Sequence, residues 1–347
     1  MKETEEGLNR RAFMKTSVTA AAVLAGGAMV DGVSAAETTE VSLKGGIPTR
    51  VLGRTKVRLP VLGHGGSAMV EPFRSTKGKF PENDFAKNVK MVRKGYDAGI
   101  RYFDTARNYR ESEDIMGEAL HDIRGDMYLA TKLGIRVAAD TRRSVETSLE
   151  KLKTDYLDAV QIHNPRDYRL CMEAHEELIK LRDEGIVRFF GITTHRHFEN
   201  MYKVISHGGF DQILITMGYF PKGMVEIMSG ESVQWRDMCV AKAAELDMGI
   251  VAMKVLGANI FSHKAKELYA DYDEKKRHRL ASAAIKWCLA DERVHVLNIG
   301  MTLPEDIDAD LKIIRADLTL TNEDRLLLAE TSQRAFQTEH VKNMEIV

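Results

Sequence analysis

The feature that most constrains the fold of this chain is a repeated alternation of short apolar segments with longer amphipathic ones. From residue 50 onward, short runs rich in β-branched residues predict strands, and the segments between them carry apolar residues at helical spacing. Eight strands are expected, at residues 60–64, 101–104, 127–131, 157–163, 187–192, 212–216, 249–253 and 296–299. This alternation is typical of a parallel sheet covered by helices.

The number and spacing of these units favour a closed barrel. Helices are expected at residues 85–98, 141–152, 172–183, 198–207 and 236–246. Among 347 residues there are only 7 prolines and no mid-chain linker, and no GxGxxG motif follows an early strand, which argues against an open doubly wound sheet. The sequence therefore predicts an α/β fold, a (β/α)8 TIM barrel. Residues 50–57 predict an N-terminal β-hairpin, with its turn near Arg54 and Thr55, that could plug one end of the barrel.

Charge and cysteine content exclude several classes of function. The 50 basic and 51 acidic residues are spread along the chain and give a formal net charge of −1, so no basic stripe indicates a nucleic-acid partner. Cys171, Cys239 and Cys288 are far apart, which excludes a CxxC metal motif and an obvious disulfide framework. We expect these thiols to be buried as small apolar groups.

The first 36 residues have the composition of a targeting peptide. Arg10 and Arg11 precede an apolar, small-residue stretch at 16–30, which is followed by the small residues of 33–36. This resembles a twin-arginine (Tat) export signal, with an ordinary secretory signal or an uncleaved membrane anchor as the alternatives. We expect export by the Tat machinery to a bacterial periplasm, with no stable membrane span after cleavage. The expected division is a signal peptide at 1–36, a linker at 37–49, the barrel at 50–335 and a C-terminal tail at 336–347.

Polar side chains end three consecutive expected strands. Asp104, Lys132 and His163 stand at these ends, and Tyr109 lies five residues beyond Asp104. The carboxyl ends of barrel strands meet at one rim, so the four side chains should converge there. Taken singly, each could be a helix cap, a solvated charge, loop packing or a core histidine. Their joint occurrence at consecutive strand ends favours a shared site, which we call the rim quartet.

The rim quartet has the composition of a proton relay. A tyrosine has a pKa of about 10, so alone it is a reluctant acid or base at neutral pH. A nearby Lys132 ammonium would favour the phenolate of Tyr109, and Asp104 would keep that ammonium charged. His163 could orient a carbonyl oxygen against the phenol. With no serine nucleophile elbow and no complete metal-ligand set in the sequence, hydride from a nicotinamide is the natural complement.

Several motifs resemble those of one family. The segments FDTARNYRESE at 103–113 and GEAL at 117–120 closely resemble the signature of aldo/keto reductases. Later blocks of that family are matched in order by LATK at 129–132, YLD at 156–158 with IHNP at 162–165, and GIVR at 185–188 with GI at 191–192. The resemblance spans about residues 50–315. It implies interconversion of aldehydes, ketones and sugars with alcohols by hydride transfer. It also implies that Tyr109 is the general acid or base, that Lys132 and Asp104 tune it, and that His163 positions the carbonyl.

The resemblance also implies NADP(H) bound across the C-terminal rim of the barrel, and no metal. The cofactor contacts carried over from the family are Gly65, Gly66, Asp104, Asn164, Thr193, Thr194, Met253, Lys254, Leu256, Gly257, Gly300, Met301, Thr302, Asp306 and Asp310.

Some of these positions depart from the family pattern. Thr194 stands where an Asn is usual, and Leu214 and Met217 stand where a Gln and a ring-stacking Tyr are usual, although Tyr219 could replace that ring. Asp306 stands where Gln or Arg is common, and Asp310 where Asn is common. A carboxylate repels a 2′-phosphate but accepts hydrogen bonds from a free ribose diol, so NAD(H) is the alternative cofactor.

Two other classes of function compete with this interpretation. A metal-dependent hydrolase on the same barrel could use His195 and His197 with His163, although the first strand offers only His64 rather than a histidine pair. A non-catalytic nucleotide-binding sensor or subunit on the same barrel would explain the departures from the family pattern. Bound cofactor without turnover of a carbonyl would identify that case.

Overall fold

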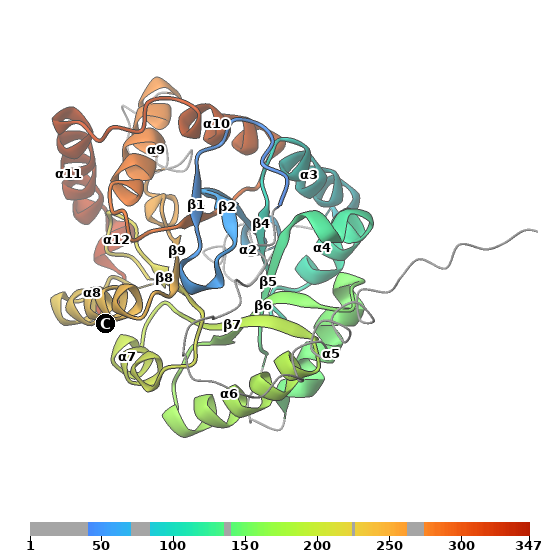
Figure 1. Cartoon of the computed structure of the whole chain (residues 1–347). Helices are drawn as coiled ribbons and strands as arrows, with labels where there is room; N and C mark the ends of the chain where they lie inside the picture. The colour runs from blue at the N-terminus through green and yellow to red at the C-terminus, as the bar shows by residue number, and fades with distance from the viewer. Residues whose placement is uncertain (1–40, 71–83, 135–139, 224–225, 262–273) are drawn as a thin grey trace, which may run out of the picture.

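A closed barrel of eight strands forms the centre of the molecule, with helices around it (Figure 1). In this computed structural model the described residues are 41–70, 84–134, 140–223, 226–261 and 274–347. The strand order around the barrel is β10-β3-β4-β5-β6-β7-β8-β9, and every neighbouring pair is parallel. The prediction of a (β/α)8 barrel is confirmed.

The barrel strands lie close to the positions expected from the sequence. They are β3 (Leu62–Gly65), β4 (Tyr102–Asp104), β5 (Tyr128–Lys132), β6 (Leu157–His163), β7 (Val187–Thr194), β8 (Gln212–Thr216), β9 (Gly249–Met253) and β10 (Val296–Gly300). Strands β6, β8 and β9 have the predicted bounds. The first predicted strand, 60–64, begins too early because Pro60 belongs to the hairpin instead.

The helices follow the strands and cover the outside of the barrel. They are α2 (Ser67–Val70), α3 (Phe85–Asp97), α4 (Ser112–Leu120), α5 (Thr141–Leu152), α6 (Tyr168–Asp183), α7 (Phe198–His207), α8 (Gly230–Glu245), α9 (Glu274–Leu289), α10 (Pro304–Ile314), α11 (Asn322–Gln337) and α12 (Glu339–Lys342). Helices α6 and α8 start earlier than predicted, because Asp167 and Ser229 cap them by accepting hydrogen bonds from the backbone N–H groups of Leu170 and Ser232.

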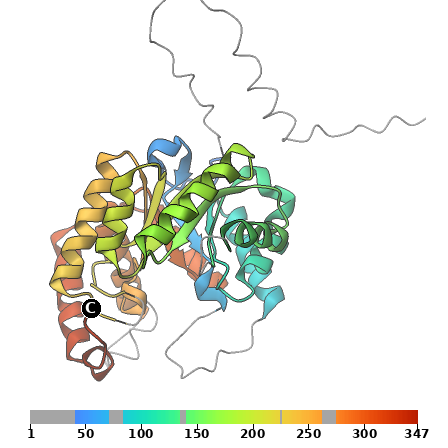
Figure 2. The same ribbon diagram turned by 90° about the horizontal axis from the view of Figure 1, so that it is seen from below.

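The N-terminal hairpin closes one end of the barrel (Figure 2). Strands β1 (Thr49–Val51) and β2 (Arg58–Pro60) pair antiparallel around the helical turn η2 (Gly53–Thr55). The predicted turn is confirmed, and the second strand lies just beyond the predicted end at 57. The side chains of Leu52, Val57 and Leu59 are buried against Tyr102 and Tyr128, at the end where the strands begin.

The residues flanking the barrel are also packed. Ser42 donates from its backbone N and its Oγ to the Asp126 carboxylate, both at 2.5 Å, and Val41 and Ile47 are buried. The described part of the predicted linker therefore lies on the barrel, whereas the predicted signal at 1–36 lies outside the described residues. Helix α11 runs through the predicted boundary at 335. No helix in the described part of the chain is long and apolar enough to span a membrane.

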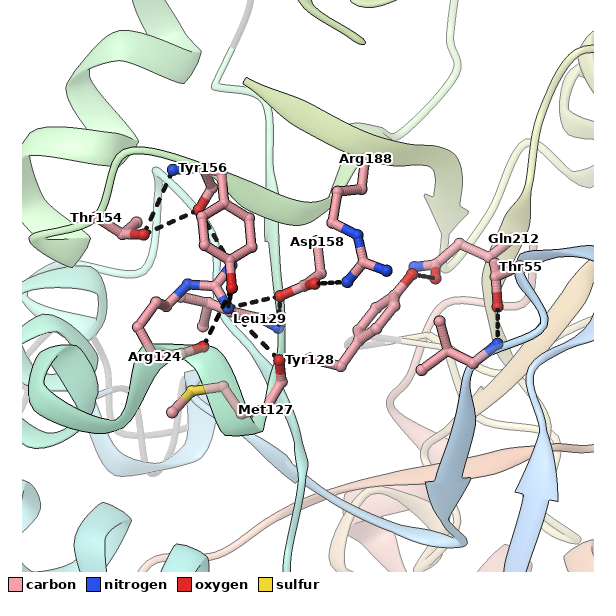
Figure 3. A network of polar contacts seen from close by, with 11 residues as sticks. Thr55, Arg124, Met127, Tyr128, Leu129, Thr154, Tyr156, Asp158, Arg188 and Gln212 are labelled. Carbon is pink, nitrogen blue, oxygen red and sulfur yellow. Dashed lines mark hydrogen bonds and ion pairs between the residues drawn. The ribbon is translucent and has the colours of Figure 1, made fainter. Parts of the chain in front are cut away.

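A buried carboxylate joins three strands on the outside of the barrel (Figure 3). Asp158 in β6 accepts from the backbone N–H of Leu129 in β5 at 2.9 Å and is paired with two arginines. Arg124 Nη1 lies 2.7 Å from one carboxylate oxygen, and Arg188 of β7 contacts the other. Such a fully paired buried charge fixes how these neighbouring segments pack.

Candidate active site

The rim quartet lies at one end of the barrel, opposite the hairpin. Asp104, Lys132 and His163 are the last residues of the consecutive strands β4, β5 and β6. Tyr109 lies in the segment between β4 and α4. Parallel neighbouring strands end at the same rim, so the structure brings together the four residues that the sequence singled out.

Asp104 and Lys132 form a buried ion pair. Lys132 Nζ contacts Asp104 Oδ1 and also donates to the Thr105 carbonyl at 2.8 Å, and the two side chains are only 2% and 1% exposed. Burial alone would lower the pKa of Lys132, but Asp104 and Tyr109 outweigh it, so the pKa of the ammonium is raised. The lysine is therefore held in its charged form at neutral pH.

Tyr109 and His163 extend the contacts outward from that ion pair. Lys132 Nζ lies 4.8 Å from the centre of the Tyr109 ring, and the Tyr109 and His163 rings meet edge to face with centroids 6.0 Å apart. Both rings are half-buried, unlike the ion pair beneath them. A molecule approaching the rim therefore meets the phenol and the imidazole before the charged pair.

The segment that carries Tyr109 is anchored by a buried glutamate. Glu113, at the start of α4, pairs with Arg107 at 2.5 Å. Its other oxygen accepts hydrogen bonds from Thr131 Oγ1 and Ser148 Oγ, each at 2.7 Å. One carboxylate thus joins the Tyr109 segment to β5 and α5. The signature segment contained Glu113, but the sequence did not indicate this role.

Two amides that the sequence analysis missed complete the surroundings of Asp104. Asn298 Nδ2 donates to Asp104 Oδ1 at 3.0 Å, and Gln161 Nε2 donates to Oδ2 at 3.1 Å. Burial raises the pKa of the Asp104 carboxyl, while Lys132 and the two amides oppose that rise. In the sequence, Gln161 and Asn298 stood out only as polar residues within otherwise apolar strands.

The glycines predicted to approach a cofactor lie where the backbone has no room for a side chain. A Cβ on Gly66 would lie 2.4 Å from Ser112 Oγ, and one on Gly65 would lie 3.0 Å from Asn298 Oδ1. A Cβ on Gly300 would lie 2.6 Å from that of Ala68. At these three positions the missing side chain makes room for other parts of the same chain, and Gly65 and Gly66 are buried while Gly300 is exposed.

Left-handed backbone marks two of the other predicted contact segments. Asn164, directly after β6, has φ +60°, and its N–H donates to the Thr193 carbonyl at 2.8 Å. Lys254 and Gly257, after β9, have φ of +62° and +58°. This segment brings a lysine and a tight turn to the rim, and a cation there suits the diphosphate of a dinucleotide.

Other predicted contacts offer less to a ligand. Thr194 is buried, and its hydroxyl donates to the Arg196 carbonyl within its own turn. Thr193, Met253 and Met301 are buried, and Leu256 is half-buried against the core. Among the departures, Leu214 and Met217 are buried, and Tyr219 packs against Phe261 and Trp287.

Asp306 is committed to the start of its own helix. Its Oδ2 accepts from Thr302 N at 2.9 Å and from Thr302 Oγ1 and Leu303 N at 3.0 Å each, while Arg277 Nη2 lies 3.2 Å from its Oδ1. Asp310, one turn later, is buried. Burial, and secondarily the charge of Asp306, raise the pKa of Asp310 to about 8, opposed by Arg277.

The histidines of the competing metal hypothesis do not form a ligand set. His195 is buried, with its Nδ1 3.5 Å from Thr216 Oγ1, and His197 begins α7 with φ +62°. Within the described residues, no group of three or more His, Cys, Asp or Glu side chains is placed to hold a metal ion.

Comparison with known proteins identifies similar sequences. The model of the aldo/keto reductase family matches residues 74–327. L-galactose dehydrogenase of Arabidopsis thaliana is 26% identical over 290 residues, which cover 77% of this chain and 88% of that protein. Methylglyoxal reductase DkgA of Yersinia pestis is 32% identical over 124 residues, which cover 34% of this chain and 43% of the reductase. The latter match therefore spans less than half of the relative.

Solved structures share the fold. The holo form of aldo-keto reductase AKR11C1 from Bacillus halodurans has a TM-score of 0.65 and 22% identity, covering 85% of this chain and 99% of that one. An aldo/keto reductase from Brucella melitensis has a TM-score of 0.58 and 23% identity, covering 82% and 99%. At these identities the likeness shows the barrel fold alone.

Proposed function

Because the chain belongs to the aldo/keto reductase family and is an NAD(P)-dependent oxidoreductase, we propose that the rim quartet carries its chemistry. The observation that most supports this is the continuous series of contacts from Asp104 and Lys132 through Tyr109 to His163. When bound at this rim, a nicotinamide supplies or removes the hydride. The quartet then has to move one proton and to orient one oxygen.

Each quartet residue has a separate task in this proposal. In carbonyl reduction, the Tyr109 hydroxyl donates its proton to the carbonyl oxygen, and the Lys132 ammonium stabilises the resulting phenolate. Asp104 keeps that ammonium charged inside the barrel. His163, edge-on to the tyrosine ring, directs the carbonyl oxygen toward the phenol. In alcohol oxidation the same proton returns to the Tyr109 oxygen.

The names of two relatives support a proposal for the substrate class. L-galactose dehydrogenase and methylglyoxal reductase are named for a sugar and a small ketoaldehyde, so we propose small polar carbonyls and sugar hydroxyls as substrates. The test measures NAD(P)H consumption with small aldehydes and NAD(P)+ reduction with aldoses, using the purified protein. Turnover with either class is expected. Nucleotide binding without any turnover would favour the non-catalytic sensor.

For the cofactor, the contacts of Asp306 favour NAD(H) over the NADP(H) expected from the family. The Asp306 carboxylate already accepts the backbone donors at the start of α10, where a 2′-phosphate would otherwise find them. Its negative charge, although paired with Arg277, disfavours a 2′-phosphate more than the uncharged ribose diol of NAD(H).

The two nucleotides can be compared by fluorescence titration. NADH is expected to bind more tightly than NADPH, and Asp306→Ser should improve NADPH relative to NADH by about tenfold, as removal of one nearby like charge allows. Asp308→Ser, on the same helix but exposed and paired with Lys94, is the control. Tighter NADPH binding by the unaltered protein would overturn the preference.

For localisation, we propose that residues 1–36 direct export of the folded protein to the periplasm. The arginine pair and small-residue stretch support the twin-arginine route, and this route suits an enzyme that must bind its nucleotide before export. Free nucleotide is scarce outside the cytoplasm, so we also propose that the cofactor is retained and recycled by two substrates. To test export, the double substitution Arg10→Lys and Arg11→Lys should leave the protein in the cytoplasm. To test retention, the purified protein is dialysed, and rapid loss of its nucleotide would contradict the proposal.

A further inference from the structure

Neutral amides hold Asp104 from two sides of the barrel. Asn298 lies in β10 and Gln161 in β6, and each of these strands is separated from β4 by one other strand. Both side chains nevertheless reach the Asp104 carboxylate, at 3.0 Å and 3.1 Å. The amides therefore contact Asp104 on the inside of the barrel, and the β10–β3 pairing that closes the barrel brings Asn298 to this side of it.

We propose that Gln161 and Asn298 are positioning residues of this enzyme, which keep Asp104 ionised and directed at Lys132 so that the lysine stays charged beside Tyr109. The proposal rests on the proposed function of the rim quartet. Each amide donates a hydrogen bond to Asp104, and in this proposal it acts on the quartet through that carboxylate.

The electrostatic argument starts from the burial of the carboxylate. At 2% exposure, Asp104 has almost no water to stabilise its charge, and burial raises its pKa. The titratable groups that face it are Lys132 from β5, Tyr102 from its own strand and, beyond Lys132, Tyr109. From strands β6 and β10 the hydrogen-bond donors to Asp104 are the uncharged amides of Gln161 and Asn298, and hydrogen bonds to the ionised form lower its pKa.

The carbonyl oxygens of the two amides show which part of each side chain is favourable. Gln161 Oε1 and Asn298 Oδ1 are buried and accept no hydrogen bond within the described residues. Burying a polar atom without a partner is unfavourable, and an apolar side chain of similar size would avoid that cost. The favourable part of each amide is therefore its N–H side, which donates to Asp104.

The barrel supplies a matched control. Gln212 in β8 is also fully buried, and its Oε1 accepts a hydrogen bond from the Tyr128 hydroxyl at 2.7 Å (Figure 3). It has the same side chain as Gln161 and is buried like it, but among the described residues it makes no hydrogen bond to Asp104. A purely structural role of buried amides predicts the same behaviour for both glutamines.

The experiment compares Gln161→Met and Asn298→Leu with Gln212→Met in the full chain. Each is assayed for kcat and KM with NADH or NADPH and glyceraldehyde across pH, together with nucleotide affinity and melting temperature. Loss of a donor should move the acidic limb of the kcat profile about one pH unit upward, because the Asp104 carboxyl then protonates more readily. On that limb kcat falls about tenfold, while KM and nucleotide affinity change little. Gln212→Met should leave the profile unmoved.

A second measurement does not depend on turnover. Infrared difference spectra against Asp104→Asn report protonation of that one carboxyl in the unreacting protein, and its titration midpoint should rise in Gln161→Met and Asn298→Leu. Absence of turnover by the unaltered protein would refute the proposed function, while the infrared midpoints would still test the amides. Unmoved midpoints, or equal changes in Gln212→Met, would overturn the positioning role.

Discussion

The two ends of this barrel bury different kinds of side chain. At the end where the strands begin, Leu52 and Leu59 of the hairpin fill the opening with hydrocarbon. At the end where they finish, Asp104 and Lys132 bury a pair of charges. Hydrocarbon burial stabilises the fold directly, whereas a buried ion pair contributes little net stability and requires all its partners. The hairpin end therefore stabilises the fold, whereas the rim end carries the reactive side chains.

The largest expected effect tests the chemical end. Tyr109→Phe should lower kcat by about 100- to 10,000-fold, the usual contribution of a general acid, while nucleotide affinity and melting temperature stay close to those of the unaltered protein. Tyr156→Phe is the control, because its hydroxyl lies near the opposite end, beside Arg124. It should lower stability slightly and leave kcat unchanged. A Tyr109→Phe protein with nearly full activity would remove the phenol from the mechanism.

The next effect tests the hydrocarbon end. Leu59→Ala removes a fully buried side chain from the hairpin and should lower the free energy of unfolding by about 2 to 5 kcal/mol. Denaturant unfolding measures this loss. Assayed below its melting temperature, the variant should keep the kcat of the unaltered protein. A parallel fall in kcat would show that the two ends are coupled rather than separate.

The sequence predicted the chemical end more completely than its supports. Asp104, Lys132 and His163 could be found because strand ends alternate with helices along the chain, and parallel strands bring those ends together. The contacts of Gln161 and Asn298 could not be predicted, because both depend on the stagger between strands two places apart, and that of Asn298 also depends on the pairing of β10 with β3 that closes the barrel.

The starts of helices and the geometry of loops also could not be predicted from the spacing of apolar residues. The caps Asp167 and Ser229 extend their helices past the apolar pattern on which the predictions rested. For Asp306, its position in the chain indicated a cofactor contact, but its three hydrogen bonds to Thr302 and Leu303 depend on the local turn. Side-chain capping of this kind is decided by three-dimensional geometry rather than by hydrophobic spacing.

A third effect is the loss of folding stability at acidic pH, which can be compared with the effects at the two ends of the barrel. His64 in β3 is fully buried between Phe103 and α3, and burial lowers its pKa to about 4. Its unfolded pKa is about 6.5, so between these values the unfolded state binds a proton that the folded state does not, and stability falls as the pH falls. The loss should reach about 3 kcal/mol near pH 4.

Urea unfolding at several pH values between 7.5 and 4.5 measures that loss, with His64→Phe as the comparison. The variant should lose less stability on acidification than the unaltered protein, whatever its stability at pH 7.5. Equal pH dependence in both proteins would assign the acid sensitivity to other groups, such as the ion pair at the rim.

The smallest effect is expected at an exposed ion pair beside the hairpin. Lys56 Nζ lies 2.8 Å from Asp247, but both side chains are more than half exposed. Lys56→Ala should therefore change the free energy of unfolding by less than about 1 kcal/mol, as thermal unfolding can verify. A much larger loss would mean that charges also hold the hydrocarbon end in place.

All three cysteines of the chain are buried, so their reaction with thiol reagents can report unfolding. Burial raises the pKa of Cys171 and Cys239 to about 12, and the thiols of Cys239 and Cys288 donate to the carbonyls of Phe198 and Met217. Thiol reagents react with the thiolate and need access to it, so the folded protein should resist alkylation at neutral pH. The rate of alkylation then follows opening of the barrel, and a single cysteine introduced at the rim could be labelled without interference.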